Sequence, residues 1–245
     1  RKLTVFENDG SGFKPGVLLA ANATDLVTAD FDGDLEADIL AGYSGKRESL
    51  FLRGEDGVWT DVGATAIGDR PKKSWTILTA GDFDNDGDMD YAALQRGAGV
   101  DGFTYLSRGD GTFAVGSRFQ NVTIPGKAEY MISGDFNRDG ALDLILNGSS
   151  GDGHISGAYT LLEGEAPAQN NWLSIELKGV VSERGGLGAR VYVTTADGKV
   201  RMLEQDSGTH FASQNSTDLH FGLAEHERAD VRIVWPDGFE QRITG

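Results

Sequence analysis

Hydrophobic and polar residues alternate in short stretches along most of the chain. In the first two thirds, apolar stretches come in pairs around an aspartate-rich segment, as residues 26–29 and 39–41 do around the first one. Short apolar or alternating runs bounded by Gly, Asp and Asn are typical of β-strands joined by tight loops. The pattern therefore predicts an all-β protein.

The aspartate-rich segment occurs three times. Residues 30–38 read DFDGDLEAD, residues 82–90 read DFDNDGDMD and residues 135–143 read DFNRDGALD, so the starts lie 52 and 53 residues apart. A period of this length predicts propeller blades or a solenoid. Asp-Gly turns, such as residues 56–57, lie further along each unit. They give about four strands per unit, the number in a propeller blade.

The repeat is incomplete at the start of the chain. Residues 3–19 resemble the second half of one more unit, without a first half before it. About three and a half blades do not close a ring, which usually needs at least four. We therefore expect a partial β-propeller. It is either the C-terminal portion of a longer protein or an open arc whose blade edge associates with another chain.

Each segment offers oxygen atoms at loop positions 1, 3, 5 and 9 and a main-chain carbonyl at position 7. Calcium takes roughly 6–8 such oxygens in a flexible geometry, whereas magnesium requires a tighter octahedron. We therefore predict about three Ca²⁺ ions. The predicted ligands are Asp30, Asp32, Asp34, Glu36 and Asp38; Asp82, Asp84, Asp86, Asp88 and Asp90; and Asp135, Asn137, Asp139, Ala141 and Asp143, of which Glu36, Asp88 and Ala141 act through their carbonyls.

Two other interpretations of these loops, an EF-hand and a plain turn, fit the sequence less well. An EF-hand requires a Glu at position 12, where this chain has Ala41, Ala93 and Leu146. Plain solvated turns also favour Asp and Gly, but three copies with ligand spacing favour a metal. We expect the first loop to bind most weakly, because Leu35 occupies position 6, where the other loops have a glycine suited to a left-handed backbone.

Charge and composition restrict the classes of partner that this protein can bind. The net charge is −16, the chain has no cysteine, and residues 1–169 carry 27 acidic against 14 basic side chains. Such a field repels nucleic acid and anionic membrane surfaces and attracts cations. No apolar run approaches the roughly 20 residues needed to cross a bilayer, so we expect no membrane insertion.

The repeat resembles the FG-GAP/VCBS repeats of integrin α-subunit propellers and their bacterial relatives. The resemblance rests on the three aspartate loops and on turn segments such as NDGSGF at residues 8–13 and GDGTF at residues 109–113. It implies a β-propeller with structural calcium between the first two strands of each blade. In such families the scaffold presents a surface that binds proteins or glycans.

A different pattern begins after the linker EAPAQ at residues 165–169. Five alternating segments in residues 170–245 predict a small β-sandwich-like domain, so we divide the chain into domains 1–169 and 170–245. The second domain resembles the ASPIC/UnbV domain, and the order of the two resembles the cartilage acidic protein-like family. The matching segments are 171–173, 185–191, 213–214, 219–223 and 235–238.

Other candidate sites have simpler interpretations. The tripeptide Arg-Gly-Asp at residues 108–110 is an integrin ligand motif, but Asp110 also opens a hairpin turn of the repeat. The glycine-rich segment 185–188 lacks the rest of a phosphate-binding loop. His154 and His226 show no metal-binding spacing, and His220 is expected to pack in a strand. A set of Asp206, His210 and a nearby serine lacks a nucleophile motif.

These observations lead to one main hypothesis and two alternatives. We expect a non-enzymatic, secreted, periplasmic or cell-surface module in which calcium is structural and the propeller presents a surface for a protein or glycan ligand. The first alternative is an enzyme, for example one that modifies polysaccharide, with its site in the propeller cup or between the domains. The second is a subunit of a larger assembly that completes the broken ring.

Overall fold

The structure is a computed structural model, and it describes residues 2–66, 77–95, 101–120, 127–149, 155–181, 183–206 and 215–245. Within these ranges the chain forms strands and one short helix, α1 (Gly63–Ala66). Every pairing between the strands is antiparallel, and the described strands form several small sheets with no closed barrel. The prediction of an all-β protein is confirmed.

Two sheets have the four strands that the repeat predicts. In each, the strands follow one another in chain order, as expected for hairpins joined by short turns. The first contains β3 (Ala23–Ala29), β4 (Asp38–Tyr43), β5 (Ser49–Arg53) and β6 (Trp59–Asp61). The second contains β7 (Ile77–Gly81), β8 (Asp90–Leu94), β9 (Asp101–Ser107) and β10 (Phe113–Gln120).

The first and last units of the repeat have fewer strands. As expected for a half unit, the start of the chain gives a two-stranded sheet of β1 (Lys2–Val5) and β2 (Val17–Ala21). The third unit has three strands, β11 (Lys127–Gly134), β12 (Asp143–Ser149) and β13 (Ile155–Leu162). Among the described residues, the segment 163–170 that follows β13 forms no fourth strand, and its Pro167 lacks an N–H for a β-ladder.

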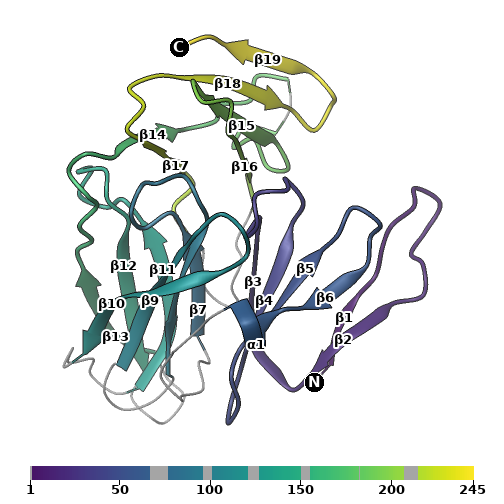
Figure 1. Ribbon diagram of the computed structural model, residues 1–245, viewed down its shortest axis with the longest axis vertical. Helices are drawn as coiled ribbons and strands as arrows, with labels where there is room; N and C mark the ends of the chain where they lie inside the picture. The colour runs from purple at the N-terminus through teal and green to yellow at the C-terminus, as the bar shows by residue number, and fades with distance from the viewer. Residues whose placement is uncertain are drawn as a thin grey trace.

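The four sheets of the repeat region pack side by side, face against face, in the order of the chain (Figure 1). One hydrophobic core lies between β1–β2 and β3–β6, a second between β3–β6 and β7–β10, and a third between β7–β10 and β11–β13. The first strands of the three larger sheets are neighbours, since β7 contacts both β3 and β11. The loops that follow these strands therefore gather at one end of the molecule.

Residues 170–245, which we call the C-terminal module, lie over that end (Figure 1). One sheet pairs β14 (Asn171–Ile175) with β17 (Leu219–Ala224). The other has the order β16 (Val200–Glu204), β15 (Arg190–Thr195), β18 (Ala229–Val234), β19 (Glu240–Ile243). Both sheets contribute to one core, in which Phe221 and Leu223 from β17 join Val191 and Val193 from β15.

Some of the segments singled out in the sequence are not described by the structure. His154, His210 and the segment 213–214 lie outside the described residues. Every β-ladder joins strands on the same side of residue 169, while the domain boundary itself stays a prediction. Among the described residues, no helix has the length and apolar character to cross a membrane.

Candidate metal centre

The three aspartate loops share one backbone conformation. Each joins the first strand of a sheet to the second, and positions 4 and 6 of each loop have a left-handed φ. At position 4 the φ angles are 80° at Gly33, 58° at Asn85 and 63° at Arg138; at position 6 they are 70° at Leu35, 88° at Gly87 and 90° at Gly140. Leu35 therefore adopts the same left-handed backbone as the glycines at position 6 of the other two loops, although it carries a Cβ.

The aspartate at position 1 organises the turn. Its carboxylate accepts the N–H of position 6 in all three loops: Leu35 on Asp30 at 3.0 Å, Gly87 on Asp82 at 2.8 Å and Gly140 on Asp135 at 3.0 Å. These bonds curl the loop around its first carboxylate. The side chains at positions 3 and 5 accept the N–H two residues further on and so stay with the turn.

The aspartate at position 9 is fully buried and accepts hydrogen bonds from its own loop and from the chain at or just after the end of the third strand. In the first loop, Asp38 Oδ2 accepts the N–H of Phe31 at 2.9 Å, and Oδ1 accepts the N–H of Arg53, at the end of β5, at 2.9 Å. Asp90 and Asp143 are equally buried and make the corresponding pairs of bonds. Position 9 thus has a structural role whether or not a metal is present.

The structure brings carboxylates together in two of the three loops. One ligand atom each from Asp30, Asp32 and Asp38 lies within 4.8 Å of the others, and the same holds for Asp82, Asp84 and Asp86. The described acidic residues of the third loop form no such group. There Asn137 replaces an aspartate, and its amide donates to Asp139 at 2.8 Å. The acidic side chains therefore converge less in the third loop than in the other two, while the expected order of affinities stays a prediction.

Burial makes the carboxylates costly to ionise in the metal-free protein. Burial raises the pKa of Asp38 to about 7, that of Asp82 to about 8 and that of Asp90 to about 9. Nearby carboxylates contribute to the raised pKa values: Asp86 and Asp84 act on Asp82, and Asp82 acts on Asp90. A bound cation would remove both effects.

One oxygen of the second loop is well suited to a hard cation. Asp82 is only 4% exposed, and its Oδ2 accepts two N–H groups, from Gly87 and Gly222. Its Oδ1 is buried and has no hydrogen-bond partner among the described residues. A buried unpaired carboxylate oxygen is unfavourable, and a metal ion at the carboxylate group would satisfy it. The residues of this loop therefore fit calcium.

The side chains at position 7 point to other partners. Glu36 forms an ion pair with Arg53, and Asp88 forms one with Lys199. Both arrangements agree with the prediction that position 7 would act through its carbonyl. The metal ligands as a set nevertheless stay predictions.

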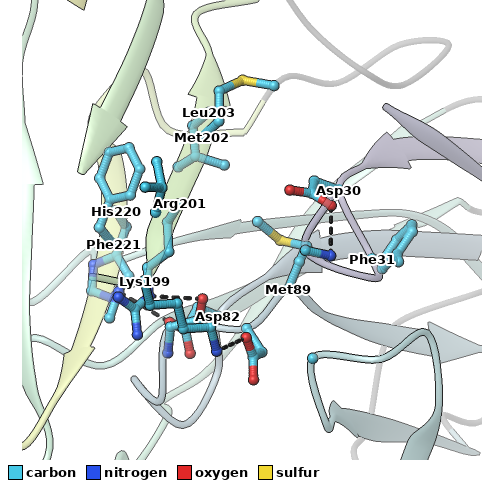
Figure 2. A pocket seen from close by; sticks show the side chains of 16 residues that line it. Asp30, Phe31, Asp82, Met89, Lys199, Arg201, Met202, Leu203, His220 and Phe221 are labelled. Atoms are coloured by element: carbon cyan, nitrogen blue, oxygen red, sulfur yellow. Dashed lines mark hydrogen bonds and ion pairs between the residues drawn. The ribbon is translucent and has the colours of Figure 1, made fainter. Parts of the chain in front are cut away.

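Sequence reasoning missed the contribution of the C-terminal module. Residues of β16 and β17 and Asn170 hydrogen-bond to the second loop. Figure 2 shows this contact in a small pocket, where Lys199, Arg201 and His220 lie on one side of Asp82 and the first loop lies opposite. His220 is buried in β17, as expected for packing, but its ring also bonds to Asn85 Oδ1 at 2.7 Å.

The Arg-Gly-Asp segment forms the turn between β9 and β10. Asp110 Oδ1 accepts bonds from the Thr112 N–H at 2.9 Å and from its hydroxyl at 2.6 Å. These bonds support the interpretation of Asp110 as a turn residue.

Comparison with known families agrees with the two parts of the chain. Residues 30–93 match the family described as FG-GAP-like repeat, and residues 179–245 match the family described as ASPIC and UnbV. The chain carries both segments. Both resemblances found in the sequence are thus confirmed.

The chain is also similar to cartilage acidic protein 1 along nearly its whole length. It is 26% identical to the Homo sapiens protein over 253 residues, which cover 96% of this chain and 37% of that protein. The Xenopus tropicalis protein is 26% identical over 261 residues, covering 96% and 38%. The chain thus spans little more than a third of these relatives.

Among solved structures, the Vibrio cholerae biofilm matrix protein Bap1 matches with 11% identity and a TM-score of 0.35, covering 96% of this chain and 43% of that one. A likeness of that degree supports no conclusion about this protein.

Proposed function

We propose that this protein is a calcium-binding extracellular or cell-envelope module without enzymatic activity. In this proposal the sheets β1 to β13 are blades of a partial β-propeller, and calcium braces the loops between the first two strands of the blades. The surfaces of the sheets that the C-terminal module leaves uncovered present a binding surface for a protein or glycan. The FG-GAP-like match and the similarity to cartilage acidic protein 1 support an adhesion or recognition role.

The observation that carries the calcium proposal is the second loop. Three carboxylates converge there, and Asp82 Oδ1 is buried with no hydrogen-bond partner in the part of the chain that the structure describes. Oxygen-only ligands on a flexible loop favour Ca²⁺ over transition metals, which prefer nitrogen and sulfur ligands. The first loop has a comparable group, and the third would bind more weakly because Asn137 contributes one negative charge fewer.

Thermal unfolding of chelator-stripped protein tests this proposal. Calcium that binds the native state raises the free energy of unfolding, by about 4 kcal/mol per site when calcium is a thousandfold above Kd, and so raises the melting temperature. We expect a clear rise with millimolar calcium, a much smaller one with magnesium, and a reduced calcium effect in Asp84→Asn. Glu55→Gln is the matched control, since Glu55 is exposed and outside the loops. The same melting temperature with and without calcium in protein shown to be metal-free would refute the proposal.

A further inference from the structure

The second aspartate loop is enclosed by the C-terminal module. The main-chain N–H of Gly222 in β17 donates to Asp82 Oδ2 at 3.0 Å, beside the bond from Gly87 within the loop. Both donors use the same oxygen, so the module helps to set the orientation of the carboxylate, and Oδ1 has no hydrogen-bond partner among the residues that the structure describes. A predicted ligand is therefore positioned by a residue 140 positions away.

The module also binds the backbone of this loop. Arg201 donates from Nε to the carbonyl of Gly87 at 2.9 Å and from Nη2 to that of Asp86 at 3.1 Å. The Ala224 N–H donates to the carbonyl of Asn85, and the Asn170 amide donates to the carbonyl of Asp84. None of these carbonyls is the predicted ligand, which is the carbonyl of Asp88. The module and a metal ion would thus use different atoms of one loop.

Asn85 connects this contact to the third loop. Its amide nitrogen donates to the carbonyl of Gly140 at 2.7 Å, and its Oδ1 contacts His220 Nε2 at 2.7 Å. Asn85 has a left-handed φ of 58°, so these bonds help to hold an uncommon backbone conformation at position 4. The loop conformation needed to gather the carboxylates is therefore supported from outside the loop.

The close approach depends on the absence of a side chain at residue 222. A Cβ built on Gly222 would lie 2.0 Å from Asp82 Oδ2 and 2.5 Å from Cα of Asn85. The φ of Gly222 is not in the left-handed region, so alanine is compatible with its strand backbone. Alanine at this position would therefore act by displacing the contact between β17 and the loop.

We propose that the C-terminal module is part of the second calcium site, so that calcium binding by residues 82–90 and docking of the module strengthen each other. This inference rests on the calcium-binding function proposed above. Without the ion, three close carboxylates repel one another and loosen the loop that the module holds; with the ion, the loop is fixed in the conformation that the module recognises. Coupling of this kind is reciprocal, because both equilibria share one free energy.

Calcium titration of the full-length chain by calorimetry tests the first half of the inference. We expect Gly222→Ala and Arg201→Gln to weaken one class of sites by roughly 5- to 150-fold, the usual range for coupled sites, and to leave the remaining calcium binding unchanged. Gly12→Ala is the control for the first variant, since a Cβ there meets nothing within 4 Å. Arg190→Gln is the control for the second, because Arg190 is exposed and pairs with Glu204 away from the loop.

Hydrogen exchange of the wild-type chain tests the second half. We expect calcium to slow amide exchange in residues 219–224, and Asp84→Asn to abolish most of that protection. If Gly222→Ala does not fold, Arg201→Gln and this exchange measurement decide the matter. The inference is overturned if both module variants bind calcium as tightly as the wild type and amide exchange in β17 does not change when calcium is added. The calcium proposal would then stay intact. No calcium binding by the wild type would instead refute the proposed function itself.

Discussion

The ring of Phe31 packs edge-on against the ring of Phe113, with centroids 5.9 Å apart and an interplanar angle of 70°. Phe31 is the second residue of the first aspartate loop, and Phe113 begins the last strand of the neighbouring sheet. Phe31 also meets Tyr91 edge-on at 6.5 Å. The loop is thus anchored in the core between two sheets.

Truncation of this anchor should be costly. Phe31 is 1% exposed, whereas Phe136, at the same position of the third loop, is 40% exposed. We expect Phe31→Ala to lower the free energy of unfolding by about 3–5 kcal/mol. Phe136→Ala should cost clearly less, about 1 kcal/mol. Denaturant unfolding of both variants in calcium checks this, and equal losses would contradict the difference in packing.

Leu35 offers a test of backbone strain. Its φ of 70° is unfavourable for a residue with a Cβ, and the corresponding residues of the other loops are glycines. We expect Leu35→Gly to raise stability in calcium by roughly 0.5–1 kcal/mol, after allowing for the greater freedom of glycine in the unfolded chain. Leu35→Ala is the control, because it shortens the side chain but keeps the Cβ. A gain in the alanine variant equal to that in the glycine variant would show that strain is not the cause.

The raised pKa values predict a pH dependence that calcium removes. Asp38, Asp82 and Asp90 have folded pKa values of about 7, 8 and 9, above the ordinary value of 3.8. A carboxyl whose pKa is raised on folding binds its proton more tightly in the native state, so its contribution to stability is lost as the pH rises through the folded pKa. We therefore expect metal-free protein to melt at a lower temperature at pH 8.5 than at pH 6.5.

The chosen pH range avoids an opposing effect. Burial lowers the pKa of His220 to about 4, so protonation of this histidine in the unfolded chain opposes folding mainly below its ordinary value of 6.5. Scanning calorimetry between pH 6.5 and 8.5, with and without calcium, measures the dependence. Asp90→Asn should flatten the slope of the metal-free protein. Stability that rises with pH in the metal-free protein would show that the loops do not behave as described.

The structural role of position 9 can be distinguished from the roles of the other loop positions by measuring stability in metal-free protein. Both oxygens of Asp38 accept main-chain N–H groups, and an asparagine would leave one of those donors unpaired. At pH 8, above the pKa of Asp38, we expect Asp38→Asn to destabilise metal-free protein by about 1–3 kcal/mol. Asp34→Asn, at an exposed position of the same loop, should change it little. Urea unfolding of both variants is the measurement, and similar effects would remove the distinction.

The features that the sequence predicts well are those encoded over short distances. The β-strands and the position of each aspartate loop between the first two strands of a sheet depend on residues close together in the chain, and the structure agrees with both. Arg201 and Gly222 could not be found in this way. They reach the second loop only through the packing of β16 and β17 on the repeat region, and no pattern near them indicates that contact.

The third repeat unit differs from its prediction in two further respects, its number of strands and the arrangement of its acidic side chains. The third repeat unit has three strands because the chain leaves the sheet after Leu162, although the repeat alone predicted a fourth. The third loop keeps the spacing of the motif but not the convergence of its acidic side chains. Phe136 is partly exposed there, so this loop also has a weaker anchor than the first loop.

The buried aspartate at position 9 also bears on how this repeat can vary. Its Oδ1 accepts an N–H that follows 15 residues later in the first unit, 17 in the second and 21 in the third, yet the three bonds measure 2.9, 2.7 and 2.9 Å. The hairpin between the second and third strands can therefore lengthen without moving the loop from its sheet. A longer hairpin would therefore change the repeat unit away from its aspartate loop, while the loop itself keeps its shape.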